Sequence, residues 1–255
     1  IRSYSINAGG GAIGGGSFEI KSSIGQVSAG FTNNTNFLHW VGFWGGDVPT
    51  PTVVYSIAAA KSYPDGTFVS ICGKVSTHAT SEISGYFYIE EPHRYGGIRI
   101  AVLGAPIANL IRGSIVNVIG TLGRTASDER VLTGPVVIVA GTQSPVAPVG
   151  MPNRSVGGAD LLDPVSGIVQ FGVAGGIGLN NVGILVRTWG QASYISGQLF
   201  ISDGSSRPMK VDTTGMSGLP GDGTFITVIG VSSLYKSSSD HLPAILPRTR
   251  QEIVP

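Results

Sequence analysis

The sequence predicts an all-β protein that contains two copies of one five-stranded module. Composition supports the all-β class, because 39 of the 255 residues are glycine and only 12% are charged. Short segments in which apolar and polar residues alternate are separated by turn-forming residues, a pattern typical of half-buried strands. Four sequence blocks then recur in the same order, about 110 residues apart, which indicates an internal repeat.

A glycine-rich segment, residues 1–52, precedes the repeat. Residues 8–16 hold six glycines in nine positions, and apolar residues alternate with smaller polar ones on both sides of them. Because this alternation is typical of strands, we expect a glycine-rich β arm here. Its large apolar side chains are the expected contacts to the sheet that receives the arm: Tyr4, Ile6, Phe18, Ile20 and Ile24.

The first module is expected over residues 53–143. Its five strands are predicted near residues 66–77, 85–91, 97–103, 114–122 and 130–140. Between the third and fourth strands lies the segment GAPIANLIRG, residues 104–113. Pro106 at a first-turn position, apolar residues at helical spacing and Gly113 as a stop signal predict a short helix in this segment.

The second module is expected over residues 156–255, after a Pro-rich connector at 144–155. Its blocks GILVRTWGQAS, QLFISDG, PMKVD and GTFITVIGVSS correspond to blocks of the first module, and residues 156–182 form a glycine-rich insertion. The order strand, strand, strand, helix, strand, strand in the first module is that of an OB barrel. The sequence therefore predicts two tandem OB-like five-stranded barrels.

Particular motifs resemble those of a known group of proteins. The first module, with PDG at 64–66, FYI at 87–89 and Gly120, resembles OB-fold modules of secreted bacterial proteins, among them accessory domains of extracellular nucleases. The second module keeps LFISDG at 199–204 but lacks the PDG turn, and the N-terminal GGGAIGGGSFEI resembles a glycine-rich segment of exported bacterial proteins. The resemblance implies a bacterial extracellular or cell-surface location, and the start at Ile1 predicts that a signal peptide has been removed.

Candidate catalytic groups are sparse. The four histidines are far apart and show no metal-ligand spacing. Glu90 and Glu91 are neighbours at a strand end, so their side chains should point to opposite faces. Cys72, the single cysteine, excludes an intrachain disulfide and is expected to be a buried hydrophobe. We therefore expect a protein that is not an enzyme and needs no cofactor or metal.

Self-assembly is the first functional hypothesis. In it, an exported structural protein adds its N-terminal strand to a neighbouring copy, head to tail, and builds an extracellular filament or surface array. The low charge content favours association, and no apolar run is long enough to span a membrane. The open alternative is that the arm folds back on its own chain.

Ligand binding is the second hypothesis. OB barrels bind single-stranded nucleic acids and oligosaccharides on a face that includes their second and third strands. The aromatic and basic residues of these strands, with one Trp of the preceding strand, form the candidate face for single-stranded nucleic acid or glycan: Phe87, Tyr88, Arg94, Arg99, Trp189, Phe200 and Lys210.

Overall fold

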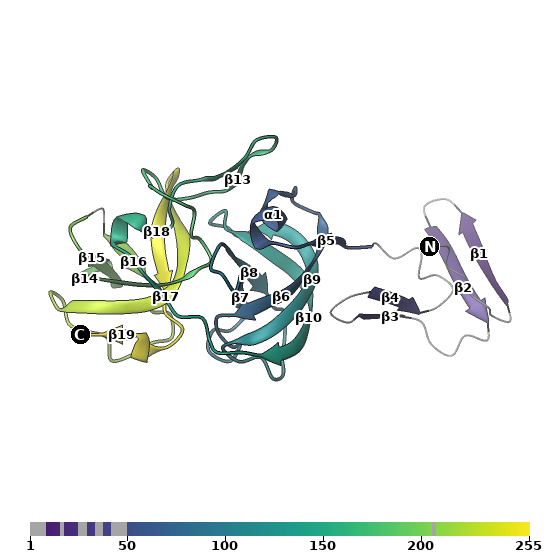
Figure 1. Cartoon of the computed structure of the whole chain (residues 1–255), viewed down its shortest axis with the longest axis horizontal. Coiled ribbons are helices and arrows are strands. Elements are labelled where there is room, and N and C mark those ends of the chain that lie inside the picture. Colours follow the sequence, from purple (N-terminus) through teal and green to yellow (C-terminus); the bar gives the residue numbers. More distant parts are fainter. Residues whose placement is uncertain (1–8, 16–17, 25–29, 34–37, 42–49, 206–207) are drawn as a thin grey trace. The chain divides into compact units, whose positions relative to one another are not determined.

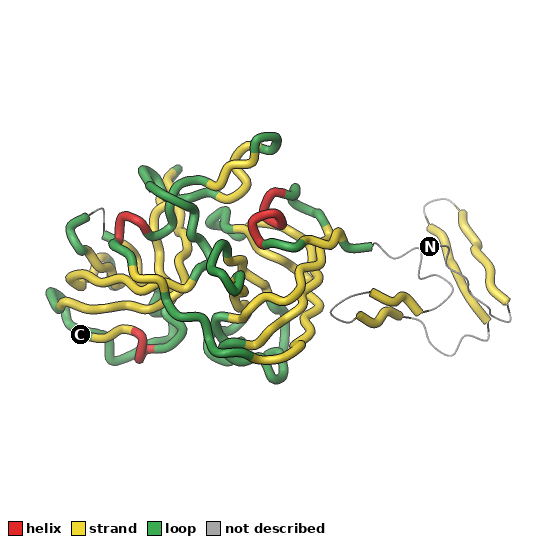
Figure 2. The backbone as a smooth tube through the Cα atoms, in the orientation of Figure 1, coloured by secondary structure: helices red, strands yellow, loops and turns green. Residues whose placement is uncertain are grey.

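The computed structural model describes residues 9–15, 18–24, 30–33, 38–41, 50–205 and 208–255. The chain divides into two compact units, Ile1–Pro51 and Thr52–Pro255. Nearly all of the regular elements are strands (Figures 1 and 2), which confirms the predicted all-β class.

The first unit contains two β-hairpins. Strand β1 (Gly9–Gly15) pairs with β2 (Phe18–Ile24), and β3 (Gly30–Asn33) pairs with β4 (Leu38–Val41), both antiparallel. Each hairpin is a two-stranded sheet of its own. A glycine-rich β segment therefore precedes the barrels, as the sequence predicts.

The first barrel belongs to the second unit. Its strands are β5 (Thr52–Val54), β6 (Phe68–Ser76), β7 (Tyr86–Glu90), β8 (Gly97–Ala101), β9 (Ser114–Arg124) and β10 (Arg130–Thr142). Pairing runs β6–β7–β8–β10–β9 and returns to β6, and β8 and β10 are parallel. A closed five-stranded barrel with this order is compatible with an OB-like fold, and all five predicted strands are present.

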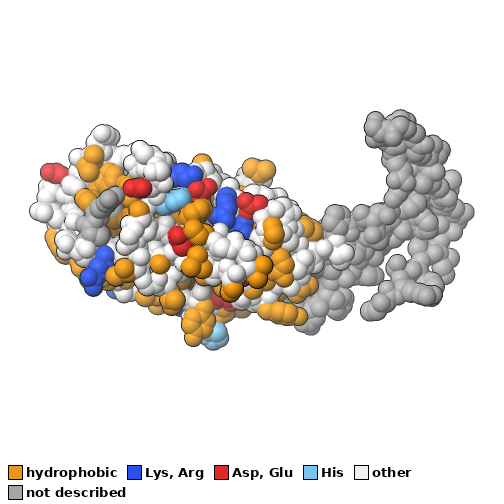
Figure 3. All heavy atoms as spheres, turned by 90° about the horizontal axis from the view of Figure 1, so that it is seen from above, with side chains coloured by type: hydrophobic (Ala, Val, Ile, Leu, Met, Phe, Trp, Pro, Cys, Tyr) orange, Lys and Arg blue, Asp and Glu red, His pale blue; other side chains and the backbone are white. Residues whose placement is uncertain are grey.

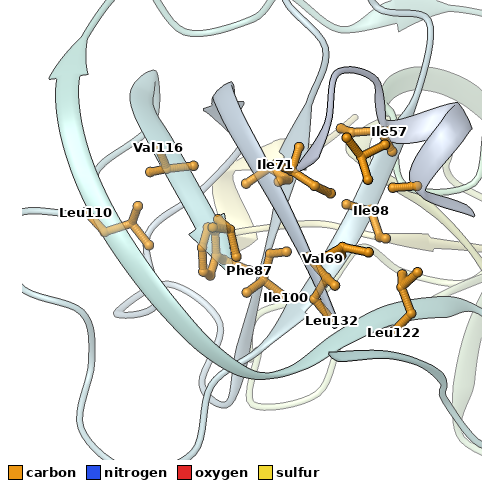
Figure 4. Packing of buried hydrophobic residues seen from close by; sticks show 14 residues of the cluster. Ile57, Val69, Ile71, Phe87, Ile98, Ile100, Leu110, Val116, Leu122 and Leu132 are labelled. Atoms are coloured by element: carbon orange, nitrogen blue, oxygen red, sulfur yellow. The ribbon is translucent and has the colours of Figure 1, made fainter. Parts of the chain in front are cut away.

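The core of the first barrel consists of apolar side chains from every strand (Figure 4). Alternate residues of β6, such as Val69 and Ile71, point inward. The expectation that Cys72 is fully buried is wrong, because its side chain is only half-buried. Helix α1 (Ile57–Ser62), which the sequence did not suggest, contributes Ile57 to the core. Ser56 precedes the helix and caps it, because its side chain accepts a hydrogen bond from the Ala59 amide.

The helix predicted over residues 104–113 is wrong, because this segment forms turns. Asn109 has a φ of 61° and Gly113 a φ of 85°, so the backbone leaves the right-handed helical region within the segment. Leu110 is nevertheless buried, and Ile107 packs against the core. The segment therefore supplies apolar side chains to the barrel as a loop.

The second barrel repeats this arrangement. Its strands are β11 (Val149–Gly150), β14 (Leu185–Ile195), β15 (Gln198–Ser202), β16 (Met209–Val211), β17 (Phe225–Ser237), β18 (Asp240–Leu246) and β19 (Ile253–Val254). Pairing runs β14–β15–β16–β18–β17 and returns to β14, with β16 and β18 parallel. The sequence repeat is therefore also a repeat of strand pairing.

Both barrels also carry a short leading strand. β5 pairs in parallel with the start of β6, and β11 pairs in parallel with the start of β14. β11 lies within residues 144–155, so the Pro-rich segment contributes a strand to the second barrel. The glycine-rich insertion contains the hairpin of β12 (Leu161–Asp163) and β13 (Gly167–Gln170), and β13 contacts α1 (Figure 1).

Candidate binding cleft between the two barrels

The backbones of the two barrels pack closely against each other at two glycines, Gly97 and Gly183. A Cβ atom added to Gly97, the first residue of β8, would lie 2.0 Å from the carbonyl oxygen of Gly183. A Cβ added to Gly183 would lie 2.6 Å from the carbonyl carbon of Gly97, and Gly183 has a φ of +93°. Both positions therefore require glycine, because a side chain on either would collide with the other backbone.

Beside the glycines, a buried ion pair holds the start of β14. Glu90, at the end of β7, accepts hydrogen bonds from the Leu185 amide and from Arg94 Nε, both at 2.7 Å. Arg94 also donates to the Leu185 carbonyl. Two side chains of the first barrel thus bind the backbone amide and the backbone carbonyl of Leu185 in the second barrel. Glu91 points away, to Lys74 and the Ile57 amide, as expected for neighbours at a strand end.

A second buried carboxylate, Glu129, bridges the barrels. It accepts hydrogen bonds from the Tyr88 hydroxyl at 2.7 Å and from Ser233 Oγ of β17 at 3.0 Å. Arg99 lies 3.7 Å from it, and burial raises the Glu129 pKa. Lys61, also buried, donates to the Val182 carbonyl, and burial lowers its pKa from 10.5 to about 8. These contacts join the barrels through polar groups that are themselves satisfied.

Further ion pairs surround this interface. Arg112 of the first barrel lies 3.1 Å from Glu252 of the second. Asp128 pairs with Lys236 at 2.6 Å and with His241 at 2.9 Å. Figure 3 shows basic and acidic side chains next to one another on one face of the molecule. The barrels are thus joined by paired charges as well as by apolar packing.

The candidate ligand-face residues are dispersed by this packing. Phe87 lies in the core of the first barrel, and Tyr88 is fully buried against Leu185 and Val231 of the second. Arg94 binds Leu185, as described above. Phe200 is only 8% exposed. None of these is an open surface for a ligand.

Trp189 lies on a different surface. Its side chain is 37% exposed and lines a hollow of about 390 Å³, together with Arg187, Phe225, Ile229 and Val254. These residues come from β14, β17 and β19, whose outward-facing side chains form the surface.

Arg99 and Lys210 come together in a cleft between the barrels. Arg99 on β8 is opposite Tyr88 of β7, and Lys210 on β16 is opposite Phe200 of β15, so the two cations hold equivalent positions in the repeat. The cleft has a volume of about 540 Å³. Besides the two cations, its main polar and aromatic lining is Glu82, Ser84, Tyr86, Ser127, Asp212, Thr214, Ser233 and Tyr235.

Two tyrosines of the cleft contact these cations. The Arg99 guanidinium lies 3.5 Å from the ring centroid of Tyr86, and the Lys210 ammonium lies 5.5 Å from that of Tyr235. The sequence did not point to either tyrosine. Tyr86 could have been found, because it lies two residues before Tyr88 on one strand and therefore on the same face. Tyr235 lies on the fourth strand, outside the strands expected to bind a ligand.

The candidate interface residues of the arm lie in the first unit. Phe18, Ile20 and Ile24 belong to β2, which pairs with β1 of the same chain. Tyr4 and Ile6 lie outside the described residues. Assembly between copies therefore stays a prediction.

Searches against protein-family models and curated proteins find no match to this chain. None of the helices that the structure describes is long and apolar enough to span a membrane. Within the described ranges, no three His, Cys, Asp or Glu side chains are grouped as metal ligands would be.

Proposed function

We propose that the chain is a non-enzymatic binding module whose ligand occupies the cleft between the two OB-like barrels. The observation that carries this proposal is the convergence of Arg99 and Lys210 from equivalent strands of the two barrels. OB barrels bind single-stranded nucleic acids and oligosaccharides with this part of the barrel. The cleft is also large enough, since sites for small ligands have volumes of about 300–1,000 Å³.

The state of Lys210 supports the proposal. Two other cations between the barrels have carboxylate partners, Glu90 for Arg94 and Glu129 for Arg99. No carboxylate of the described residues lies within ion-pair distance of Lys210, although its side chain is half-buried. A half-buried ammonium beside a tyrosine ring suits a negatively charged group of a ligand.

Loss of this cation should weaken binding enough to remove the signal on an array. We expect labelled full-length protein to bind at least one member of an array of polysaccharides and single-stranded oligonucleotides, and Lys210→Ala to lose that signal. Arg187→Ala is the matched control, because Arg187 is an exposed cation of the same barrel outside the cleft. If Lys210→Ala and the unsubstituted protein bind the same members of the array, the cleft is not the binding site.

A second candidate function is self-assembly of an exported bacterial protein at the cell surface. The observation that favours it is that the two N-terminal hairpins are separate two-stranded sheets. An isolated hairpin is only marginally stable in water, and unpaired edges can accept a strand from another chain. Pairing between copies would complete these sheets and could extend into a filament, because a head-to-tail contact need not close.

Electron microscopy tests this candidate directly. We expect the full chain to form filaments or arrays at high concentration, and a chain that begins at Thr52 to remain monomeric. The boundary is chosen because Thr52–Pro255 forms a compact unit, and circular dichroism would check that the truncated barrels are folded. A full-length protein that stays monomeric, or a truncated one that polymerises, would show that the hairpins do not drive assembly.

A further inference from the structure

The charge balance of the cleft indicates which class of ligand it binds. Building on the proposed function, we infer that the ligand is an acidic glycan, a sugar chain that carries carboxylate or sulfate groups, and not a single-stranded nucleic acid. The cleft contains two cations, Arg99 and Lys210, and two carboxylates, Glu82 and Asp212. Its lining is therefore mixed in charge.

This mixture is unfavourable for nucleic acid. A phosphodiester chain carries a negative charge on every nucleotide, and most of its non-specific affinity comes from several Lys and Arg contacts. The carboxylates of Glu82 and Asp212 would repel such a chain. A sugar chain differs, because its acidic groups can pair with the cations while its hydroxyls donate hydrogen bonds to the carboxylates.

The aromatic side chains point to the same class. Binding of single strands relies on ring faces on which bases stack. The Arg99 guanidinium covers one face of the Tyr86 ring. The rings of Tyr235 and Phe200 pack edge to face, with their centroids 6.5 Å apart. Tyr88, the remaining aromatic of this surface, is fully buried. The cleft therefore lacks the stacking surface of a typical single-strand site.

The acceptor groups of the cleft are held in fixed positions. Asp212 accepts hydrogen bonds from the Thr214 amide at 3.1 Å and the Thr214 hydroxyl at 2.6 Å. Glu82 accepts from the Ala79 amide and from Arg112, both at 2.8 Å. Groups held in this way need little ordering when a ligand binds. With the hydroxyls of Ser84 and Ser127, they match the many hydroxyls of a sugar chain.

Calorimetric titration of the full-length protein tests this inference. The probes are hexagalacturonate, a sulfated galactose hexamer, an uncharged galactose hexamer and hexathymidylate. We expect one or both acidic hexamers to bind most tightly, and Lys210→Ala to weaken that binding roughly tenfold or more, because a charge-assisted hydrogen bond is lost. Arg187→Ala should leave it unchanged. Comparing the two acidic hexamers identifies the source of the negative charge.

Asp212→Asn separates the two ligand classes. It should weaken binding of the acidic sugar, because one of the two acceptor oxygens becomes an NH2 group that cannot accept from a sugar hydroxyl. It should strengthen any binding of hexathymidylate, because a repulsive charge is removed. Tighter binding of hexathymidylate that depends on Lys210 would overturn the glycan inference and leave the proposed cleft intact. Equal binding of the uncharged hexamer, unaffected by Lys210→Ala, would overturn the requirement for an acidic group. Absence of binding by all four probes would overturn the inference, whereas the proposed function would fail only if no member of the array bound through Lys210.

Discussion

Gly97→Ala should lower the free energy of unfolding by about 3 kcal/mol or more, as expected for severe overpacking. The added methyl would lie 2.0 Å from the Gly183 carbonyl oxygen, and the group it meets is backbone of the other barrel. Relief therefore requires the two barrels to move apart, which would also break the nearby hydrogen bond between Glu90 and the Leu185 amide. Chemical denaturation followed by tryptophan fluorescence measures the loss.

Gly123→Ala is the matched control for this substitution. Gly123 also lies in a strand of the first barrel, but a Cβ at this position has no neighbour within 4 Å and needs no left-handed backbone. The free energy of unfolding of the Gly123→Ala variant should therefore change little, or rise slightly because alanine restricts the unfolded chain. Equal stabilities of the two variants would mean that the close approach of Gly97 and Gly183 is not needed for folding.

Glu90→Gln should remove a pH dependence of stability from the protein. Burial raises the pKa of Glu90 from 4.5 to about 7, against the opposing effect of Arg94. The pKa of Glu90 is higher in the folded protein than in the unfolded chain. At pH values between the two, the folded protein therefore holds a proton on Glu90 that the unfolded chain has released. The stability that Glu90 contributes is therefore present below pH 4.5 and is lost as pH rises through about 7.

The expected size of this effect is roughly 3 kcal/mol between pH 4.5 and 8, from the shift of the pKa. Glutamine keeps an oxygen that accepts from the Leu185 amide but does not titrate. Denaturation curves of both proteins at pH 5 and pH 8 give the difference. If the parent protein and Glu90→Gln change in parallel with pH, then Glu90 does not titrate in this range and the interface tolerates its charge.

The strands were predictable from the sequence because their signal is local. Alternating residues such as Val69 and Ile71 reach the core by strand periodicity alone. The helix over residues 104–113 was wrong because the same apolar residues can fill the core from a loop, and the left-handed Asn109 was not apparent from the pattern.

The ligand face was less predictable, because it depends on contacts between the barrels. Tyr88 points outward from its strand, as expected, but the second barrel covers it. Arg94 is likewise used to bind Leu185. What could be predicted was the equivalence of Arg99 and Lys210 in the repeat, although nothing in the sequence indicated that both would face one cleft.

A crystal structure of the full chain with bound hexagalacturonate would show whether the cleft between the barrels is a ligand site. We expect the acidic sugar to lie between the barrels, with its carboxylates near Arg99 and Lys210 and its hydroxyls near Glu82 and Asp212. A ligand bound instead in the hollow beside Trp189, with the cleft empty, would show that the cleft is not the ligand site.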